Sequence, residues 1–399
     1  MSCLSCNSKF EKNLINFGTN AKSSEFVRNT RELKKIKKYK TVVVVCKKCK
    51  LIQLKQPINF QEIVPSKKWI INKEEDKHHK NFVNILNHRR IFKKDSKILI
   101  ISNYDEFFQK NLRLKGFKKV FKLNIKDHFN IIDKNFFRQE VIQHHLNFIN
   151  SIKLVNKLGK FDVIVCTKLL EHTQNFKNFF NFCNNVLNKN GKLIIDVPDS
   201  SKSLLQGNPM LIWEEHVSYF TSNSLINTLT FHKFKKKYLK IYTYKQEDVI
   251  VGIFEKSNNY SFLRVGKKNF FKIFKKKISA KKKIVKKIFN DLKLQNKTIF
   301  LFGVGHNAIF FLNYFEIKKF INFVIDDNKN KIGLYIPFTK IIIRSSRYLE
   351  QIKNKKSICF LSLNIELEKK IINSKKKIFN KNCNFFSVYS DSPRYFLNK

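Results

Sequence analysis

The sequence predicts an α/β protein in which a small cysteine-rich head precedes two domains built on parallel sheets. Three observations support this fold class. A chain of 399 residues exceeds one ordinary hydrophobic core, so two or three domains are expected. Strands alternate with helices after residue 96 and again after residue 297, which is the pattern of a parallel sheet. Two Cys-x-x-Cys pairs stand in the first fifty residues.

The composition favours a globular protein of the cytosol. Hydrophobic residues make up 43% of the chain, which is enough to fill several cores. The longest uncharged apolar run, Thr41 to Cys46, is far shorter than the ~20 residues of a membrane-spanning helix. The opening Met1-Ser2-Cys3 lacks the basic and apolar stretches of a secretory signal. We therefore expect a cytoplasmic protein without a membrane span.

The formal charge of +50 is spread along the whole chain. A nucleic-acid site normally shows as a patch of Lys and Arg on one face. Here Lys is abundant together with Asn, Ile and Phe, and these four residues share A/T-rich codons. A nucleotide bias therefore explains the charge, and we expect no specific nucleic-acid partner. The Lys-rich runs at 267–287 and 375–377 are interpreted as solvated helix faces.

The two cysteine pairs predict a metal site. Each pair places two thiolates on one tight turn, and two such turns supply the four soft ligands of a tetrahedral Zn²⁺. A disulfide or a redox motif is the alternative, but disulfides are disfavoured in the cytosol and a redox pair usually occurs singly. Four cysteine ligands leave no open coordination position, so the zinc is expected to be structural. The expected ligands are Cys3, Cys6, Cys46 and Cys49.

The other four cysteines stand singly in apolar surroundings, and we interpret them as small core residues. They are Cys166, Cys183, Cys359 and Cys383.

The middle of the chain has the pattern of a parallel sheet covered by helices. Apolar runs predict strands, and helical spacing predicts helices between them. The segment Asn188 to Gly191 is expected to end one helix with a glycine cap. Ligands of such sheets bind at the carboxyl ends of the strands. The expected strands are 97–101, 119–124, 161–166 and 192–197, and the expected helices are 105–115 and 174–187.

A second strand–turn–helix unit follows a Lys-rich stretch at 258–294, which predicts a connecting helix. The strand 297–302 runs into Gly303-Val304-Gly305-His306-Asn307 and a helix to Tyr314. Glycines in such a turn let backbone N–H groups approach a phosphate-type ligand. The strand 321–326 ends in acidic residues about twenty positions later, as in a dinucleotide fingerprint. A tight turn without a ligand is the alternative.

Three segments of the central part of the chain are characteristic when taken together. They are Phe161-Asp162 through Leu170-Glu171-His172, Asn190-Gly191 to Asp196-Val197-Pro198, and Glu215-His216-Val217-Ser218-Tyr219-Phe220. These segments resemble the sugar C-methyltransferase family, whose members use S-adenosylmethionine to methylate a carbon of nucleotide-linked keto-deoxysugars. With the cysteine head and the C-terminal part, the resemblance covers nearly the whole chain, and the last of the three segments is the most specific.

The resemblance implies that a base removes the proton beside a ketone before the carbon attacks the cofactor's methyl group. His216 suits this base, because imidazole titrates near working pH. Glu215 would orient the imidazole, stabilise its charge or bind sugar hydroxyls. Taken alone, the residues leave another interpretation open, in which both side chains satisfy buried backbone groups.

The resemblance also implies a cofactor site. The family's glycine-rich loop is represented here by Ser102-Asn103-Tyr104-Asp105-Glu106, in which only Asp105 keeps the family residue. Asn124 takes the place of an acidic residue that binds the ribose hydroxyls. The implied cofactor residues are Ser102, Asn103, Asp105, Asn124, Leu170, Glu171 and His172.

For the substrate, the family's Tyr-His-Glu-His segment reads Trp213-Glu214-Glu215-His216, and an upstream tyrosine-rich segment reads Lys68-Trp69-Ile70-Ile71. The family ends in a second Rossmann-like domain whose Asp-x-Asn-x-x-Lys segment matches residues 326–331 and which would hold the nucleotide. The implied substrate residues are Trp213, Tyr219, Gly303, Gly305, Asn307, Asp326 and Asn328.

We therefore predict a zinc-binding head at 1–60 and an S-adenosylmethionine-dependent methyltransferase-like domain at 61–255. A connecting helix and a Rossmann-like substrate-binding domain are predicted at 256–399. The leading hypothesis is a C-methyltransferase acting on a nucleotide-linked keto-deoxysugar. A catalytically degenerate relative that binds a sugar nucleotide or acts as a scaffold is the second hypothesis. A basic zinc-ribbon protein that binds nucleic acid is the third.

Overall fold

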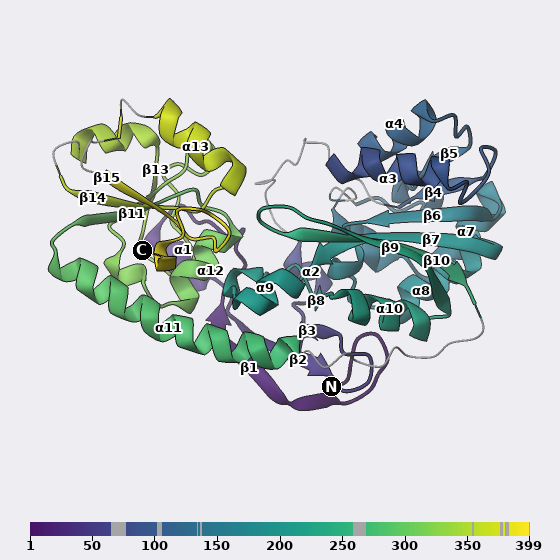
Figure 1. Ribbon diagram of the computed structural model, residues 1–399, viewed down its shortest axis with the longest axis horizontal. Coiled ribbons are helices and arrows are strands. Elements are labelled where there is room, and N and C mark those ends of the chain that lie inside the picture. Colours follow the sequence, from purple (N-terminus) through teal and green to yellow (C-terminus); the bar gives the residue numbers. More distant parts are fainter. Residues whose placement is uncertain are drawn as a thin grey trace.

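Three sheets organise the protein in the computed structural model (Figure 1). They have four, six and five strands and belong to the head, the central part and the C-terminal part of the chain. The predicted fold class, an α/β chain with two Rossmann-like units and a small cysteine head, is confirmed. The structure describes residues 1–64, 77–101, 106–133, 135, 138–257, 269–352, 355–375, 378–379 and 383–398.

The head is an antiparallel sheet in the order β1-β2-β3-β8. Its second strand contains four consecutive valines, which are all buried, and β-branched residues suit such a half-covered pleated surface. Two short helices flank the sheet, and each begins at an asparagine whose side chain accepts a backbone N–H. The elements are β1 (Phe10–Asn20), α1 (Thr30–Lys35), β2 (Tyr39–Cys46), β3 (Ile52–Leu54), α2 (Phe60–Ile63) and β8 (Ser218–Tyr219).

The fourth strand of the head comes from far along the chain. β8 pairs with β3 through Ile52 opposite Tyr219 and Gln53 opposite Ser218. In addition, the Leu54 N–H donates to the Val217 carbonyl at 3.0 Å. The strand after the second cysteine pair therefore holds the segment that directly follows His216.

The central sheet has the order β5-β4-β6-β7-β10-β9. Its first four strands are parallel, and β10 and β9 extend it as an antiparallel edge. The strands are β4 (Ile98–Ile100), β5 (Val120–Lys122), β6 (Phe161–Thr167), β7 (Leu187–Asp199), β9 (Phe234–Tyr242) and β10 (Asp248–Lys256).

Helices cover both faces of this sheet (Figure 1). Side chains alternate between the faces, so Ile98 and Ile100 pack with α3 and α4 while Leu99 and Ile101 pack with the helices of the other face. The helices are α3 (Lys77–His88), α4 (Glu106–Leu114), α5 (Ile125–Phe129), α6 (Gln139–His145), α7 (Phe148–Leu158), α8 (Phe176–Val186), α9 (Ser201–Gln206) and α10 (Ser222–Phe231). Two 3₁₀ turns, η1 (Leu170–His172) and η2 (Pro209–Leu211), complete this part.

The predicted glycine cap at Gly191 is wrong. Helix α8 ends at Val186, and β7 begins at the next residue, so Gly191 lies within a strand. A Cβ atom at position 191 would lie 2.9 Å from the Leu187 Cβ and 3.0 Å from the Asn188 carbonyl oxygen. The glycine is therefore explained by the close approach of the chain to itself at the start of β7.

The C-terminal sheet is wholly parallel, in the order β13-β12-β11-β14-β15. Its strand order reverses between β11 and β14, which places the glycine turn after β11 at a switch point. The elements are α11 (Phe270–Leu294), β11 (Thr298–Phe302), α12 (His306–Tyr314), η3 (Lys318–Phe320), β12 (Phe323–Ile325), β13 (Ile343–Arg344), η4 (Ser346–Ile352), β14 (Ser357–Leu361), α13 (Ile365–Ser374), β15 (Cys383–Ser387) and η5 (Phe396–Asn398).

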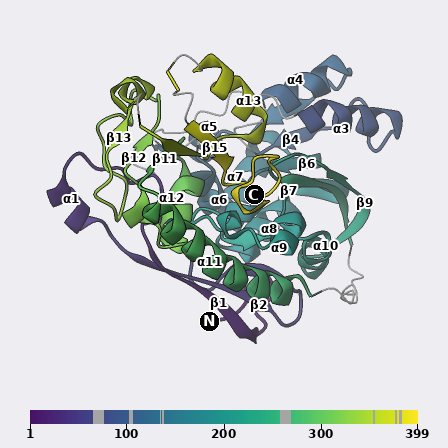
Figure 2. The same ribbon diagram turned by 60° about the vertical axis from the view of Figure 1, so that its left-hand side comes forward.

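The head contacts both of the larger parts. Its Phe17 ring lies 6.3 Å from Phe274 of α11 and 5.6 Å from Phe310 of α12, and Figure 2 shows α11 running beside β1 and β2. The four head cysteines instead pack into the core cluster of the central sheet. The domain boundaries at 60 and 255 stay predictions. The four single cysteines are all buried, which confirms their expected core position.

Among the residues that the structure describes, no helix is both long and apolar enough to cross a membrane.

Gly303, the first glycine of the turn after β11, has a φ of +94°. A Cβ atom there would lie 2.6 Å from the Ser362 carbonyl oxygen. We expect Gly303→Ala to lower the free energy of unfolding by about 2 kcal/mol or more, through backbone strain and this clash. Gly305→Ala is the matched control, because nothing lies within 4 Å of a Cβ atom at position 305. Urea midpoints that fall equally in both variants would contradict the argument.

Candidate active site and zinc site

The four head cysteines converge on one point. The Sγ atoms of Cys3 and Cys49 lie 3.6 Å apart, those of Cys6 and Cys46 lie 3.4 Å apart, and all four are within 4.8 Å of one another. Tetrahedral Zn²⁺ with Zn–S bonds of about 2.3 Å requires S···S separations of about 3.8 Å. The neighbouring sulfurs, Cys3 foremost, raise the pKa of Cys49, so four thiolates need a cation between them. The donor set therefore fits a structural zinc.

The zinc cluster is tied to the strand that follows it. The Leu4 N–H donates to the Oε1 atom of the buried Gln53 at 3.0 Å, and Gln53 pairs with Ser218 of β8. The first cysteine turn, β3 and the segment after His216 are thus connected through one side chain and one strand pair.

A group of titratable side chains lies beyond the carboxyl end of β6. The η1 turn carries Glu171 and His172, and the loop before β8 carries Glu215 and His216. One atom each of Glu171, His172 and His216 lies within 4.8 Å of the others. The same holds for Glu140, His172 and Glu215. The structure thus brings together the two predicted catalytic residues and two of the predicted cofactor residues.

His172 is the positively charged centre of this group. Its Nδ1 atom lies 3.0 Å from the Glu140 Oε1 atom, and both side chains are buried. Burial alone would lower the pKa of His172, but the carboxylates of Glu140, Glu171 and Glu215 outweigh burial and raise it to about 9. At neutral pH, His172 is therefore an imidazolium.

This ion pair predicts a pH-dependent stability. The folded-state pKa of His172 is raised, so its contribution is complete below about pH 6.5 and is lost as the pH rises through about 9. The pKa of Glu140 is lowered by His172 against the effect of burial, so its own contribution is lost only in acid. At pH 7, we expect the free energy of unfolding of the wild-type chain to exceed that of the Glu140→Gln variant by on the order of 2 kcal/mol. Urea titrations at pH 7 and pH 10 should show this difference shrinking, and a constant difference would contradict the pairing.

The pKa values of His216 and Glu215 are shifted in opposite directions. Burial, followed by the charge of His172 and then His306, holds the pKa of His216 well below its usual range. Burial, followed by Glu140 and Glu214, raises the pKa of the Glu215 carboxyl well above its usual range. Environments that push neighbouring pKa values apart are typical of acid–base sites. His216 is therefore a free imidazole at neutral pH, able to accept a proton.

Trp213 joins all three parts of the chain at this site. Its Nε1 atom donates to the Ser23 hydroxyl of the head at 3.2 Å. Its ring stacks on His306 of α12 with centroids 4.5 Å apart and lies 4.7 Å from the His216 ring. The neighbouring Glu214 accepts from the Ser23 hydroxyl at 2.8 Å. The glycine turn of the C-terminal domain is therefore in direct contact with the histidine cluster.

Tyr219 and Leu170, both predicted site residues, are fully buried. The Tyr219 hydroxyl accepts from the Trp213 N–H at 3.2 Å and donates to the Trp213 carbonyl at 3.1 Å, so it fixes the backbone of the site loop. Leu170 packs in the core of the central domain. Their roles toward substrate and cofactor stay predictions.

In the C-terminal turn, Asp326 is fully engaged within the protein. Its carboxylate accepts from the N–H groups of Val304 and Asn328 at 3.0 and 2.9 Å, and from the Lys331 Nζ at 3.1 Å. Lys331 in turn donates to the Val304 carbonyl at 2.6 Å. The acidic strand end therefore holds the glycine turn in place.

The remaining predicted residues of this domain lie around the same turn. The Asn307 Nδ2 atom donates to the Tyr389 hydroxyl at 2.9 Å, and the Asn328 Oδ1 atom accepts from the Asn330 N–H at 3.0 Å. Gly305 is the N-cap of α12. The structure thus groups these residues beside His306, and their contacts with substrate stay predictions.

The predicted cofactor position at the end of β5 has a cavity of about 330 Å³ lined by Asn124, Asp127 and Ile142 among others. Pockets for small ligands typically start at about this size. The Asn124 carboxamide caps α5, accepting from the Lys126 and Asp127 N–H groups, so its oxygen is already used. Ser102, Asn103 and Asp105 lie outside the described residues, as does the segment at 68–71. The cavity lies at the carboxyl edge of the parallel sheet, which is where α/β sheets of this kind bind ligands.

A second buried cluster braces the same edge of the sheet. The Nε2 atoms of His78 and His79 contact one carboxylate oxygen of Asp196 at 2.7 and 3.0 Å, and the Tyr244 hydroxyl lies 2.8 Å from the His78 Nδ1 atom. The two histidines lower the pKa of Asp196 against the effect of burial. The residue types could hold a metal, but two imidazole donors already satisfy this oxygen, so the cluster fixes α3 onto β7.

Sequence reasoning missed several residues of the site, chiefly His306, Glu140 and Ser23. His306 stood inside the glycine turn, and its position beside two glycines was the available signal. Glu140 and Ser23 carried no signal, because they approach the site only through the tertiary fold.

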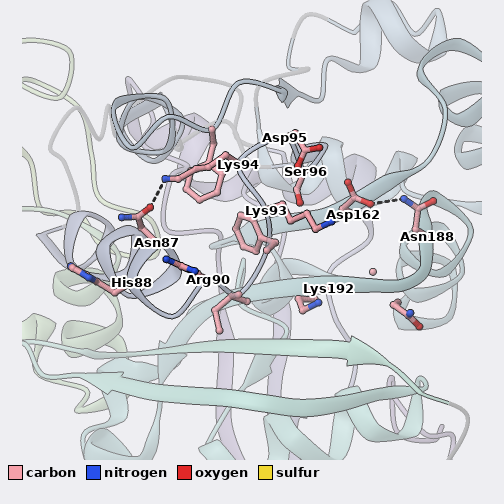
Figure 3. Close-up of a pocket in the computed structure, with 15 residues that line it drawn as sticks. Asn87, His88, Arg90, Lys93, Lys94, Asp95, Ser96, Asp162, Asn188 and Lys192 are labelled. Atoms are coloured by element: carbon pink, nitrogen blue, oxygen red, sulfur yellow. Dashed lines mark hydrogen bonds between the residues drawn. The ribbon is translucent and has the colours of Figure 1, made fainter.

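A larger cavity of about 920 Å³ lies at the opposite edge of the central sheet (Figure 3). It is lined by residues that precede β4, among them Lys93 and Lys94, and by Asp162 at the start of β6. Hydrogen bonds from Lys94 to Asn87 and from Asn188 to Asp162 cross its wall. No predicted site residue lines this cavity, and it lies away from the strand ends where the titratable cluster gathers.

Sequence models of three protein families match consecutive parts of the chain. A zinc binding domain matches residues 3–63, a methyltransferase domain matches residues 73–234, and a C-methyltransferase C-terminal domain matches residues 256–388. No curated protein matches the sequence.

Solved methyltransferases are among the structures similar to this chain. One is the 1,6-didemethyltoxoflavin-N1-methyltransferase of Burkholderia thailandensis, with 12% identity, coverage of 46% of this chain and 80% of that chain, and a TM-score of 0.31. Another is the magnesium protoporphyrin IX methyltransferase of Synechocystis PCC 6803, with 8% identity, coverage of 47% and 90%, and a TM-score of 0.28.

The fold, the site at the carboxyl edge of the central sheet and the matched methyltransferase domain define an S-adenosylmethionine-dependent methyltransferase. The head binds structural zinc. The zinc binding, methyltransferase and C-methyltransferase C-terminal domains follow one another along the chain. This is the architecture that the resemblance to sugar C-methyltransferases implied.

Proposed function

We propose that the chain methylates a carbon atom of a nucleotide-linked keto-deoxysugar in the cytoplasm. The observation that carries this proposal is the contact between the two halves of the site. His216 and Glu215 lie beside the imidazolium of His172, and the glycine turn of the C-terminal domain reaches them through the stack of His306 on Trp213. One domain can therefore hold the nucleotide while the other presents the base.

In this proposal, His216 removes the proton beside the ketone. Its imidazole is neutral at working pH, so a ring nitrogen is free to accept. The His172 imidazolium, 4.7 Å from the His216 ring by centroid, stabilises the negative charge that develops on the ketone oxygen. Burial raises the pKa of the Glu215 carboxyl, and in its protonated form this carboxyl can donate a hydrogen bond to a sugar oxygen. When bound, S-adenosylmethionine supplies an electrophilic methyl group to the carbanion.

The C-terminal domain is proposed to bind the nucleotide at the turn between β11 and α12. Nothing lies within 4 Å of a Cβ position at Gly305 among the described residues, so a ligand can approach the backbone there, and the N-terminus of α12 favours a phosphate. Asp326 supports the turn through its contact with the Val304 N–H.

Calorimetry and a methyl-transfer assay test the proposal on the full zinc-loaded chain. We expect saturable binding of S-adenosylmethionine, and transfer of its labelled methyl group to carbon in at least one of a panel of nucleotide-linked keto-deoxysugars. Thermal stabilisation by nucleotide-sugars without any binding of the cofactor at millimolar concentration would instead indicate a non-catalytic relative. Binding of nucleic acid that falls steeply with salt, without cofactor binding, would indicate the basic zinc-ribbon alternative.

A further inference from the structure

Glu171 is a buried carboxyl group beside the proposed base, and the reaction described so far does not use it. Its side chain lies in the η1 turn after β6 and is only 2% exposed. Within the described part of the chain, its Oε2 atom has no hydrogen-bond partner. A buried carboxylate oxygen without a partner is costly to fold, and a catalytic role is one of the explanations for such a group in a native structure.

The fold keeps Glu171 next to His216. A carboxylate oxygen of Glu171 and a ring nitrogen of His216 lie within 4.8 Å of each other. The Val217 N–H donates to the Glu171 carbonyl at 2.8 Å, so the backbone of the base is bound to the backbone of the carboxylate. This pairing does not depend on flexible side chains.

A proton accepted by His216 is destabilised there, because His172 already carries a positive charge nearby and the two charges repel each other. His172 itself cannot accept the proton, since its pKa of about 9 keeps it protonated. Among the described residues, Glu215 is grouped with Glu140 and His172, whereas His216 is grouped with Glu171 and His172. Asp196 is held as a carboxylate by two histidines. Within the group that Glu171, His172 and His216 form in the described part of the chain, Glu171 is the remaining acceptor.

We propose that Glu171 is the terminal proton acceptor of the reaction, taking through the His216 imidazole the proton that leaves the substrate carbon. This inference rests on the proposed function. The C–H electron pair stays with the substrate as an enolate, and the proton binds one ring nitrogen of His216. The other ring nitrogen releases its proton to Glu171, which leaves His216 neutral and Glu171 as a carboxylic acid. The enolate carbon then forms a bond to the methyl group as the methyl–sulfur bond breaks.

The surroundings of Glu171 suit this exchange. Burial raises the pKa of its carboxyl to about 7, with His172 and Lys168 acting against burial and Asp196 adding to it. Glu247, from the loop before β10, also faces it. A group with a pKa near working pH can take up the proton and release it again in each turnover.

The test compares the full chain with Glu171→Gln, which keeps the shape of the side chain and removes its basicity. Without S-adenosylmethionine, in D₂O, the wild-type chain should exchange the hydrogen beside the ketone of a reactive keto-deoxysugar nucleotide. We expect Glu171→Gln to slow this exchange at least tenfold at an unchanged KM. Glu350→Gln neutralises an exposed carboxyl in η4 of the C-terminal domain and should exchange within threefold of the wild type.

Infrared difference spectra of the ligand-free chain provide a readout that needs no substrate. A protonated-carboxyl band absent from Glu171→Gln should disappear as the pH rises through about 7. If the Glu171 carboxyl titrates near pH 4, or if Glu171→Gln leaves the exchange rate unchanged, this inference is overturned while the proposed function stands. If Glu171→Gln binds S-adenosylmethionine more weakly but keeps the wild-type exchange rate, Glu171 is a cofactor-binding residue and the inference is likewise overturned. If the wild-type chain neither exchanges nor methylates any nucleotide-sugar, the proposed function fails and this inference falls with it.

Discussion

Replacing Cys46 by serine is expected to remove zinc and unfold the head. The four sulfur atoms lie within 4.8 Å of one another, and structural zinc supplies about 10 kcal/mol or more of folding free energy in small domains at pH 7. Loss of a metal site is also among the few mechanisms that cost more than about 4 kcal/mol. We expect the zinc content to fall from one equivalent to none and the first thermal transition to fall by at least about 10 °C.

Metal analysis by mass spectrometry and thermal unfolding measure this effect together. Cys183→Ala is the matched control, because it removes a fully buried thiol that takes no part in the cluster. It should keep one equivalent of zinc and lose only about 1 kcal/mol of stability. A Cys46→Ser chain that retains its zinc would show that the four cysteines are not the ligands.

Replacing His216 by alanine is expected to lower methyl transfer by about 10²- to 10⁴-fold, because the proposed base is lost. The side chain makes ring contacts with Trp213 and His172, but its backbone contacts remain, so zinc content and cofactor affinity should stay unchanged. Turnover is measured with labelled S-adenosylmethionine and a reactive nucleotide-sugar.

His88→Ala serves as the comparison for this variant, because His88 is an exposed imidazole at the end of α3. It should leave turnover unchanged. Turnover by His216→Ala within a few-fold of the wild type would exclude His216 as the base, whatever its contacts.

Local patterns were sufficient to predict individual strands and helices. The apolar run at Ile98 to Ile101 predicted a buried strand, and its side chains alternate between the two faces of the sheet. The spacing of the cysteines predicted the zinc ligands, because two tight turns with four thiolates have few other uses. These features depend on residues close together in the sequence.

Contacts between distant residues could not be predicted in the same way. The stack of His306 on Trp213 and the pair of Glu140 with His172 join residues far apart in the chain. Gly191 was misread because a glycine after a helix usually marks a cap, whereas here a close approach to Leu187 requires it. Tertiary packing decided between two ordinary uses of the same residue.

The strand β8 has a consequence for the order in which the protein is made. The cysteines and the first three head strands leave the ribosome long before Ser218 and Tyr219, which complete their sheet. Until then, the buried face of β3 and its edge lack their final partner, so the head is finished only after most of the central sheet has been synthesised. The head sheet is therefore completed, and His216 is positioned, in a single late event of synthesis. A fragment that ends after the first three head strands lacks the fourth strand of its sheet.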